Sequence, residues 1–409
     1  MDASGLCSQG LSVNYGTVIR FLARIPRADG FALRMATVYA AFFLFGGIQM
    51  PYLPAWLEAR GLDASEIGIV LAVPMLIRIV AVPLATRLID RHAEVQVALA
   101  AAATLSAAGY AVMGFGGGFI AILAAYAAVS VVSSPVLPLA DSYSLRGLRA
   151  RGVAYGPVRL WGSVAFILAN MAGGVLLSRL GAGYLVWALA VTMAATAVAA
   201  WRLPHTPDGA AAAAPRPASG GLWRSGVFVA VIVGASLIQA SHAVLYGFAT
   251  LQWTVKGLDG TTIGSLWALG VVAEIGLFAV SARLVARVGA IEMILLGGIG
   301  AVLRWTAMAF DPPAILLPVL QCLHGLSFGA THLGAMDVLS RLAHRRGGAT
   351  AQGDFSAVQG GTFAAAMGVS GVLVAAFGSA AYFAMAAVAA AGVAIALGAR
   401  PAWRESYPA

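Results

Sequence analysis

The chain is built from long apolar runs separated by short polar segments. Runs such as Met35 to Leu57, Val95 to Met113, Trp161 to Leu177 and Tyr382 to Leu397 approach the roughly 20 residues that a helix needs to cross hydrocarbon. Backbone N–H and C=O groups in lipid must be hydrogen-bonded within their own segment, so these runs predict helices. An all-α integral membrane protein with about twelve transmembrane helices follows. We expect the spans at about 35–57, 65–88, 95–115, 118–143, 156–178, 184–202, 227–253, 261–284, 290–310, 314–339, 355–377 and 381–399.

The polar loops repeat along the chain at one fixed offset. Shifting the sequence by 196 residues lays GLDASEIG (Gly61–Gly68) on GLDGTTIG (Gly257–Gly264) and ATRLIDR (Ala85–Arg91) on SARLVAR (Ser281–Arg287). This pattern predicts two parallel six-helix pseudo-repeats, with a substrate held between them near the bilayer midplane. The expected organisation is an N-terminal tail (1–30), a first half (31–203), a linker (204–226), a second half (227–399) and a C-terminal tail (400–409).

Composition and charge agree with a membrane protein. Hydrophobic residues make up 60% of the 409 residues and charged residues only 10%, whereas soluble domains carry about 25% charged residues. The net charge of +9 comes mostly from arginines that flank the apolar runs, so we expect no nucleic-acid partner. These arginines gather on the side of the chain ends, and the other side has only Arg60, Arg179 and Lys256. The positive-inside rule therefore predicts cytoplasmic termini in a bacterial-type inner membrane.

Other targeting and redox signals are weak. Residues 1–30 lack the apolar stretch of a cleaved signal peptide, and both Met1 and Met35 stay open as the start. Cys7 lies in the polar tail and Cys322 in an apolar run, so no disulfide, metal or cofactor is expected.

Five segments distributed over both halves form a recognisable set: PLADSYSLR (Pro138–Arg146), YGPVRLWGS (Tyr155–Ser163), ASHAVLYGF (Ala240–Phe248), SLWALGVVAEI (Ser265–Ile275) and HGLSFGATHLGAMD (His324–Asp337). With these segments the chain resembles the major facilitator superfamily, and within it the 3-phenylpropionate permease-like group, distant kin of nucleoside and lactose proton symporters. The superfamily's loop motif after the second span is reduced here to LATRLIDRHAEV, which keeps Asp90 and Arg91 but lacks the glycines and the trailing basic pair.

Two ionisable residues fall in the middle of spans at matching positions of the repeat. Arg78 and Glu274 are separated by the same 196 residues, and there the halves differ in charge. Ionisable groups at mid-membrane depth are costly, so each requires a functional reason. We expect Glu274 to carry the coupled proton, and Arg78 to bind a substrate carboxylate in bidentate fashion. The alternative is a buried ion pair of Arg78 with Glu274 that joins the halves.

Several polar and aromatic residues are candidates for the substrate cavity. His242 and Tyr246 share a helix face and, with Trp267, can form a wall for a flat substrate, or simply pack between helices. Arg159 and Arg304 are each either a cavity candidate or an interfacial residue, and for Arg304 beside Trp305 we favour snorkelling to the interface. The remaining candidates are Gln49, Tyr52 and His332, together with His324, which we interpret as polar contacts and not as metal ligands.

A third set is expected to act at the gate near the chain ends. Asp141 and Asp337 match across the repeat, which favours a structural role repeated in each half over substrate contact. We expect salt bridges from these aspartates to loop arginines, Arg87 or Arg91 in the first half and Arg283 or Arg287 in the second. Asp90 belongs to the same gate through its loop motif.

These features predict a secondary transporter, most simply a proton symporter of a small aromatic carboxylate that acts as a monomer. Symport of a nucleoside or a sugar and proton antiport by an exporter are alternatives. An integral membrane enzyme or a receptor without transport is the rival class. An enzyme is not expected, because no nucleophile, base or metal cluster gathers near one interface.

Overall fold

The computed structural model describes residues 30–92, 94–205, 222–343 and 348–406, and these residues are helical or lie in short connections. The expected tail over 1–29, the centre of the linker over 206–221 and residues 407–409 lie outside this part of the chain. The side chains of Asp90 and Arg91, two of the expected gate residues, also lie outside it.

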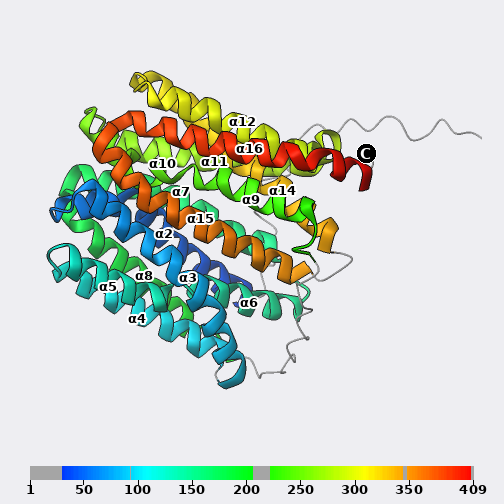
Figure 1. Cartoon of the computed structure of the whole chain (residues 1–409). Helices are drawn as coiled ribbons and strands as arrows, with labels where there is room; N and C mark the ends of the chain where they lie inside the picture. Colours follow the sequence, from blue (N-terminus) through cyan, green and yellow to red (C-terminus); the bar gives the residue numbers. More distant parts are fainter. Residues whose placement is uncertain (1–29, 93, 206–221, 344–347, 407–409) are drawn as a thin grey trace, which may run out of the picture.

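The helices of the first half run side by side in the lower part of Figure 1. They are α2 (Gly30–Ala59), α3 (Ala64–His92), α4 (Val95–Phe115), α5 (Phe119–Ser133), α6 (Val136–Arg149), α7 (Tyr155–Leu180), η1 (Ala182–Tyr184) and α8 (Leu185–Trp201). The predicted span over 118–143 is thus two helices, α5 and α6, with Pro135 between them. Proline has no N–H to continue the hydrogen-bond ladder, which explains the break.

The second half repeats this arrangement with two further breaks. Its elements are α9 (Gly226–Ala240), α10 (Ala243–Val255), α11 (Gly260–Val288), α12 (Ala290–Ala309), η3 (Ala314–Leu316), α13 (Leu317–His324), η4 (Gly325–Ala330), α14 (Thr331–Ala343), α15 (Gly348–Phe377), η5 (Gly378–Ala380) and α16 (Ala381–Ser406). The described chain contains 11 apolar helical stretches long enough to cross a membrane, and the last, Ala351–Glu405, comprises both α15 and α16. The twelve predicted spans are therefore all present.

The last helix is longer than the sequence predicts. The expected end is residue 399, whereas α16 continues to Ser406. Glu292 at the start of α12 accepts hydrogen bonds from Arg400 (3.1 Å) and Arg404 (2.8 Å), and Trp403 is buried. These contacts stabilise a helical turn that hydropathy alone assigns to a tail.

The repeated loop motif has the same structure in both halves. Gly61 and Gly257 adopt φ angles of +85° and +82°, which favour glycine. Two residues later an aspartate caps the next helix: Asp63 accepts from the N–H of Glu66 (2.9 Å) and Asp259 from that of Thr262 (2.7 Å). The hydrogen bond from the Thr262 N–H holds the pKa of Asp259 below its usual value. We call the face with these two loops the loop side, and the opposite face, where α2 begins and α16 ends, the terminus side.

The two halves contact each other closely on the loop side. A Cβ atom on Gly68 of α3 would lie 3.0 Å from Gly371 of α15, and Gly174 of α7 is packed more tightly still against Gly260 of α11. Two hydrogen bonds also cross between the halves here. The Thr250 hydroxyl donates to the Pro51 carbonyl (2.6 Å), and the Gly260 N–H donates to the Ser178 hydroxyl (2.8 Å).

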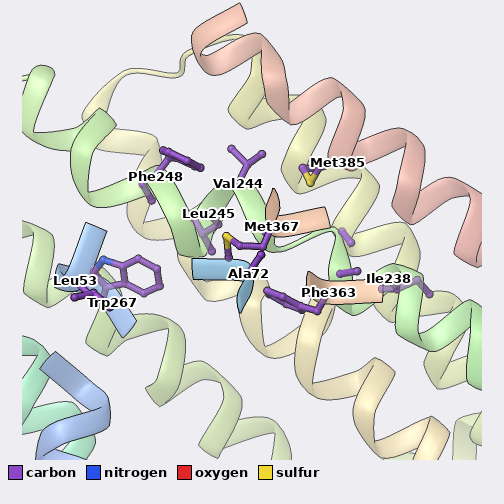
Figure 2. Close-up of a cluster of buried hydrophobic side chains, with 14 of the residues drawn as sticks. Leu53, Ala72, Ile238, Val244, Leu245, Phe248, Trp267, Phe363, Met367 and Met385 are labelled. Carbon is purple, nitrogen blue, oxygen red and sulfur yellow. The ribbon is translucent and has the colours of Figure 1, made fainter. Parts of the chain in front are cut away.

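The apolar core follows the same asymmetry. One cluster contains residues of both halves, and Figure 2 shows part of it, with Ala72 of α3 among the side chains of the second half. A second cluster, which includes Met35, Tyr39 and Tyr143, is formed by the terminus-side ends of the first half alone. Buried apolar packing therefore joins the halves toward the loop side, and the described residues form no shared cluster at the terminus side.

Candidate functional site

Two interrupted spans of the second half meet in the interior. Between α9 and α10, the Ser241 hydroxyl donates to the carbonyl of Ile238 (2.6 Å), and Nδ1 of His242 lies 3.1 Å from the carbonyl of Gln239. Side chains thus take carbonyls that a continuous helix would bond, which interrupts the ladder. In the tenth span, Gly325–Ala330 form a π-helical turn between α13 and α14, a feature common at functional sites. Nε2 of His242 lies 3.0 Å from the hydroxyl of Ser327 in this turn.

Arg304 of α12 lies beside this junction and is 1% exposed. Its guanidinium donates to Oε1 of Gln321 (2.5 Å) and to the hydroxyl of Ser327 (3.3 Å), and lies 3.3 Å from Nδ1 of His324. The expectation that Arg304 snorkels to the interface is wrong. The flanking Trp305 is also buried and stacks with Arg304 (4.7 Å to the ring centroid) inside the second half.

The donors and acceptors fix the direction of this network. Arginine only donates, so Nδ1 of His324 must accept from Arg304 and the proton of the neutral ring sits on Nε2. That nitrogen lies 3.5 Å from the Glu274 carboxylate and 3.5 Å from the Tyr246 hydroxyl. The Glu274 side chain is 20% exposed. One imidazole ring therefore separates the buried cation from the acid.

The three aromatic candidates lie together near this acid, with His242 and Trp267 buried and Tyr246 partly exposed. The ring of Tyr246 lies 5.8 Å from that of His242, 6.0 Å from Trp267 and 5.8 Å from Phe363, with the last pair stacked. Trp267 precedes Glu274 by seven residues on α11, so both point to one face. His332 lies one turn beyond Phe328, stacked on its ring at 6.3 Å, and Nδ1 of His332 is buried without a hydrogen bond.

The candidates of the first half divide into two groups. Gln49 of α2 donates to the hydroxyls of Tyr110 (2.9 Å) and Tyr126 (2.8 Å), a polar cluster in the interior of that half. Tyr52, in contrast, is fully buried, and its hydroxyl donates to the backbone carbonyl of Asn170 (2.6 Å). A Cβ on Gly264 would lie 2.9 Å from that hydroxyl, so Tyr52 packs where the halves meet.

Arg78 has a different environment from Arg304. It follows Leu71 by seven residues, which puts both on one face of α3, and a Cβ atom on Gly247 of α10 would lie 3.7 Å from the Leu71 side chain. Arg78 therefore faces the second half. Its side chain is exposed, and it makes no hydrogen bond or ion pair with the described residues. Arg78 and Glu274 do not form the alternative ion pair, because the Glu274 carboxylate contacts His324 instead.

The expected gate aspartates contact groups other than the described loop arginines. Asp141 accepts hydrogen bonds from Tyr39 (2.7 Å) and Tyr155 (2.8 Å) and lies 4.0 Å from Arg159. Asp337 pairs with Arg341 of its own helix (2.8 Å).

None of the loop arginines with described side chains completes these pairs, and the side chain of Arg91 lies outside the described part of the chain. Arg87, Arg283 and Arg287 are exposed and pair with neither aspartate among the described side chains. The prediction placed the partners in the loops, whereas each aspartate contacts an arginine that lies nearer to it. Arg159 lies in the second turn of α7, toward the terminus side, and is stacked at 4.0 Å on Phe43 of α2.

Comparison with known proteins agrees with this architecture. The family described as the MFS_1-like family matches residues 32–385. The chain belongs to this family of the major facilitator superfamily. It is therefore a multi-pass membrane transporter and not an enzyme, as the resemblance implied.

Two relatives and two solved structures carry further information. The carrier is 29% identical over 364 residues to the probable 3-phenylpropionic acid transporter of Escherichia coli (strain K12), which covers 87% of this chain and 94% of that protein. It is 30% identical over 326 residues to the maltose permease of Geobacillus stearothermophilus, covering 79% and 82%. In fold it resembles the nucleoside transporter NupG (TM-score 0.77, 17% identity, 91% and 99% covered). It also resembles a bacterial homologue of the human lysosomal transporter Spinster in an inward-facing, occupied conformation (TM-score 0.69, 16% identity, 92% and 98% covered).

The sequence did not indicate that Arg304, Gln321 and Ser327 belong to one buried network of the carrier. A signal for two of them was present in the tenth span, where Gln321, His324 and Ser327 recur at three-residue spacing and mark one polar helix face. No comparable pattern surrounds Arg304, whose hydrogen-bond partners all come from another span.

We predict that Arg304→Gln destabilises the protein by about 3 kcal/mol, because it removes a buried cation and leaves several polar groups unpaired. Thermal unfolding of purified protein in detergent measures this as a lowered apparent Tm. Arg224→Gln, at an exposed site, is the matched control and should leave the Tm unchanged. Equal Tm values for the two variants would contradict a structural role for the Arg304 network.

Proposed function

We propose that this transporter carries a small carboxylate with an aromatic body together with a proton. The observation that carries the proposal is Arg78, an arginine in a membrane span that faces the opposite half and has no partner among the described residues. A guanidinium inside a membrane span has a high free-energy cost unless an anion pairs with it. Its planar fork matches a carboxylate in bidentate geometry. The relative named as a probable 3-phenylpropionic acid transporter supports this substrate class.

The body of the substrate would lie against the second half. Tyr246 is partly exposed there and would contact the substrate ring, while the buried rings of His242 and Trp267 would support it from behind. Aromatic rings favour offset-stacked or edge-to-face contacts with one another. Gln49 and His332 would supply hydrogen bonds around the rim of the cavity, while Arg159 would act at its terminus-side entrance. Tyr52 would hold the halves together on the loop side and would not touch the substrate.

Glu274 is the proposed proton carrier. Its carboxylate is partly exposed and approaches Nε2 of His324 and, through that ring, the Arg304 guanidinium. A carboxylate in this position can exchange a proton with the cavity and respond to a change in nearby charge. Binding of the substrate anion at Arg78 and of the proton at Glu274 would then favour each other through the electrostatic field of the shared cavity.

Transport would follow from rocking of the two halves, residues 31–203 and 227–399, around this site. The arginine distribution supports a cytoplasmic terminus side in a bacterial-type inner membrane, so contacts on the loop side would correspond to an inward-facing state. Asp90, Arg91, Arg283 and Arg287, together with Asp141 and Asp337, would close the terminus side in the other state. One chain contains both halves, so a monomer suffices.

Symport of a sugar is the second candidate. The maltose permease is as similar to this chain as the phenylpropionic acid transporter, and the Gln49–Tyr110–Tyr126 cluster supplies the hydroxyl and amide groups that a sugar needs. A sugar, however, would leave Arg78 without an anion. Nucleoside symport and proton antiport by an exporter use the same framework and are separated by the measurements below.

Replacing Arg78 by Gln should raise the apparent KM for 3-phenylpropionate by about 10- to 100-fold, because a charge-assisted bidentate contact is lost. Uptake into proteoliposomes measures the change. Arg87→Gln removes a charge from an exposed position of the same helix and should leave KM unaltered. Transport of maltose or a nucleoside, with no transport of the acid, would reject the carboxylate assignment.

Replacing Glu274 by Gln should separate exchange from accumulation. The neutral amide resembles the protonated acid, so the variant should still exchange substrate across the membrane at equilibrium. It should fail at uphill uptake driven by a pH gradient, because the return step no longer releases a proton. Glu94→Gln, at an exposed site on the terminus side, should retain both activities. Uphill uptake at the wild-type level would remove Glu274 from the coupling role, and loss of both activities would favour a structural role.

A further inference from the structure

A cavity lies on the loop side, between the two halves and apart from the polar network of the second half. Its volume is about 400 Å³, within the usual range of about 300–1,000 Å³ for small-molecule sites. The first half contributes the end of α2 and the start of α3, with Glu58 and Leu62. The second half contributes the ends of α10 and α15, with Phe248 and Val374. Any molecule bound here touches both halves.

The charges that line this cavity are unbalanced. Glu58, Asp63 and Asp311 face it together with a single cation, Lys256. The ammonium of Lys256 is already engaged, since it lies 2.6 Å from the Asp311 carboxylate and donates to the carbonyl of Pro312 (2.8 Å). An anion entering the cavity would therefore have to displace Asp311 and would meet two further carboxylates.

Of the three carboxylates that line the cavity, only Glu58 has no partner among the described residues. Asp63 has a structural partner, because its carboxylate caps α3 at the N–H of Glu66. The carboxylate of Glu58 makes no hydrogen bond or ion pair with the described residues, although the nearby Arg60 donates to the Gly114 carbonyl and stacks on Trp56 at 5.1 Å. Unpaired acid at one end of an otherwise largely apolar cavity matches a ligand with a cationic head and an apolar body.

We propose that this loop-side cavity binds a small organic cation with an aromatic or aliphatic body, with Glu58 as the counter-ion. Such a ligand bridges α2 and α3 to α10 and α15, so it binds the arrangement in which the halves meet on the loop side. It would shift the population toward that state by its difference in affinity between the two states. The binding site is argued from the cavity alone, whereas the shift in population rests on the proposed rocking of the halves.

The test uses trimethyl(2-phenylethyl)ammonium as the probe and calorimetric titration of the purified full chain in detergent. The neutral comparator is 2-phenylethanol, and Glu94→Gln controls for loss of a carboxylate elsewhere. The cation should bind the wild type more tightly than the alcohol does. Glu58→Gln should weaken binding of the cation about fivefold and leave the alcohol unaffected, since only the charge contact is lost. Val255→Trp, at an exposed residue of the rim, should obstruct the cavity and remove binding of both.

Equal affinity of the cation for wild type and Glu58→Gln, or no preference over the alcohol, would overturn the site.

The effect on conformation is measured separately with spin labels at Arg179→Cys and Thr261→Cys, which lie on opposite halves at the loop side and away from the cavity. The bound cation should increase the fraction of molecules in which the labels at positions 179 and 261 are close together. Binding without that shift would overturn the coupling to rocking and leave the binding site in place. Neither readout requires knowledge of the transported solute, so failure here is distinct from failure of the proposed function.

Discussion

The structure depends on one constraint, the close approach of the two halves on the loop side. Glycines make that approach feasible, since Gly174 and Gly260 leave no room for a side chain between α7 and α11. Across the same face, only short contacts such as Thr250 to Pro51 connect the halves by hydrogen bonds among the described residues. An interface of close glycine contacts, apolar side chains and a few hydrogen bonds can separate without unfolding either half, because each half keeps its own helix packing.

The polar interior of the second half is possible because side chains replace the backbone bonds that its broken helices lack. Lipid offers no partners for free carbonyls, so irregular backbone is confined to the protein interior. Ser241 and His242 satisfy carbonyls at one break, and Ser327 in the π-helical turn connects that break to Arg304. The same breaks position His324 between Arg304 and Glu274. Helix irregularity and the candidate chemistry therefore have a common origin.

Much of the fold could be predicted from the sequence, because hydrophobic length and a fixed repeat offset are local signals. The matching caps at Asp63 and Asp259 show that the repeat of the sequence is also a repeat of structure. The partners of individual charges could not be predicted in the same way. Hydropathy shows that Arg304 lies in a span but not which way it faces, and the pairing of Asp141 with Arg159 requires the packing of α6 against α7. Roles of residues between the halves depend on tertiary geometry, which a single sequence does not contain.

Distances between spin labels on the two halves test the central claim most directly. One pair, Arg179→Cys with Thr261→Cys, reports the loop side, and a second pair, Arg149→Cys with Ser340→Cys, reports the terminus side, both with Cys7 and Cys322 replaced by Ser. Double electron–electron resonance with and without transported substrate should show two populations in which the pairs change in opposite senses, one lengthening as the other shortens. A single unchanged distance for both pairs, in protein that transports, would contradict rocking of the halves about the loop-side contact.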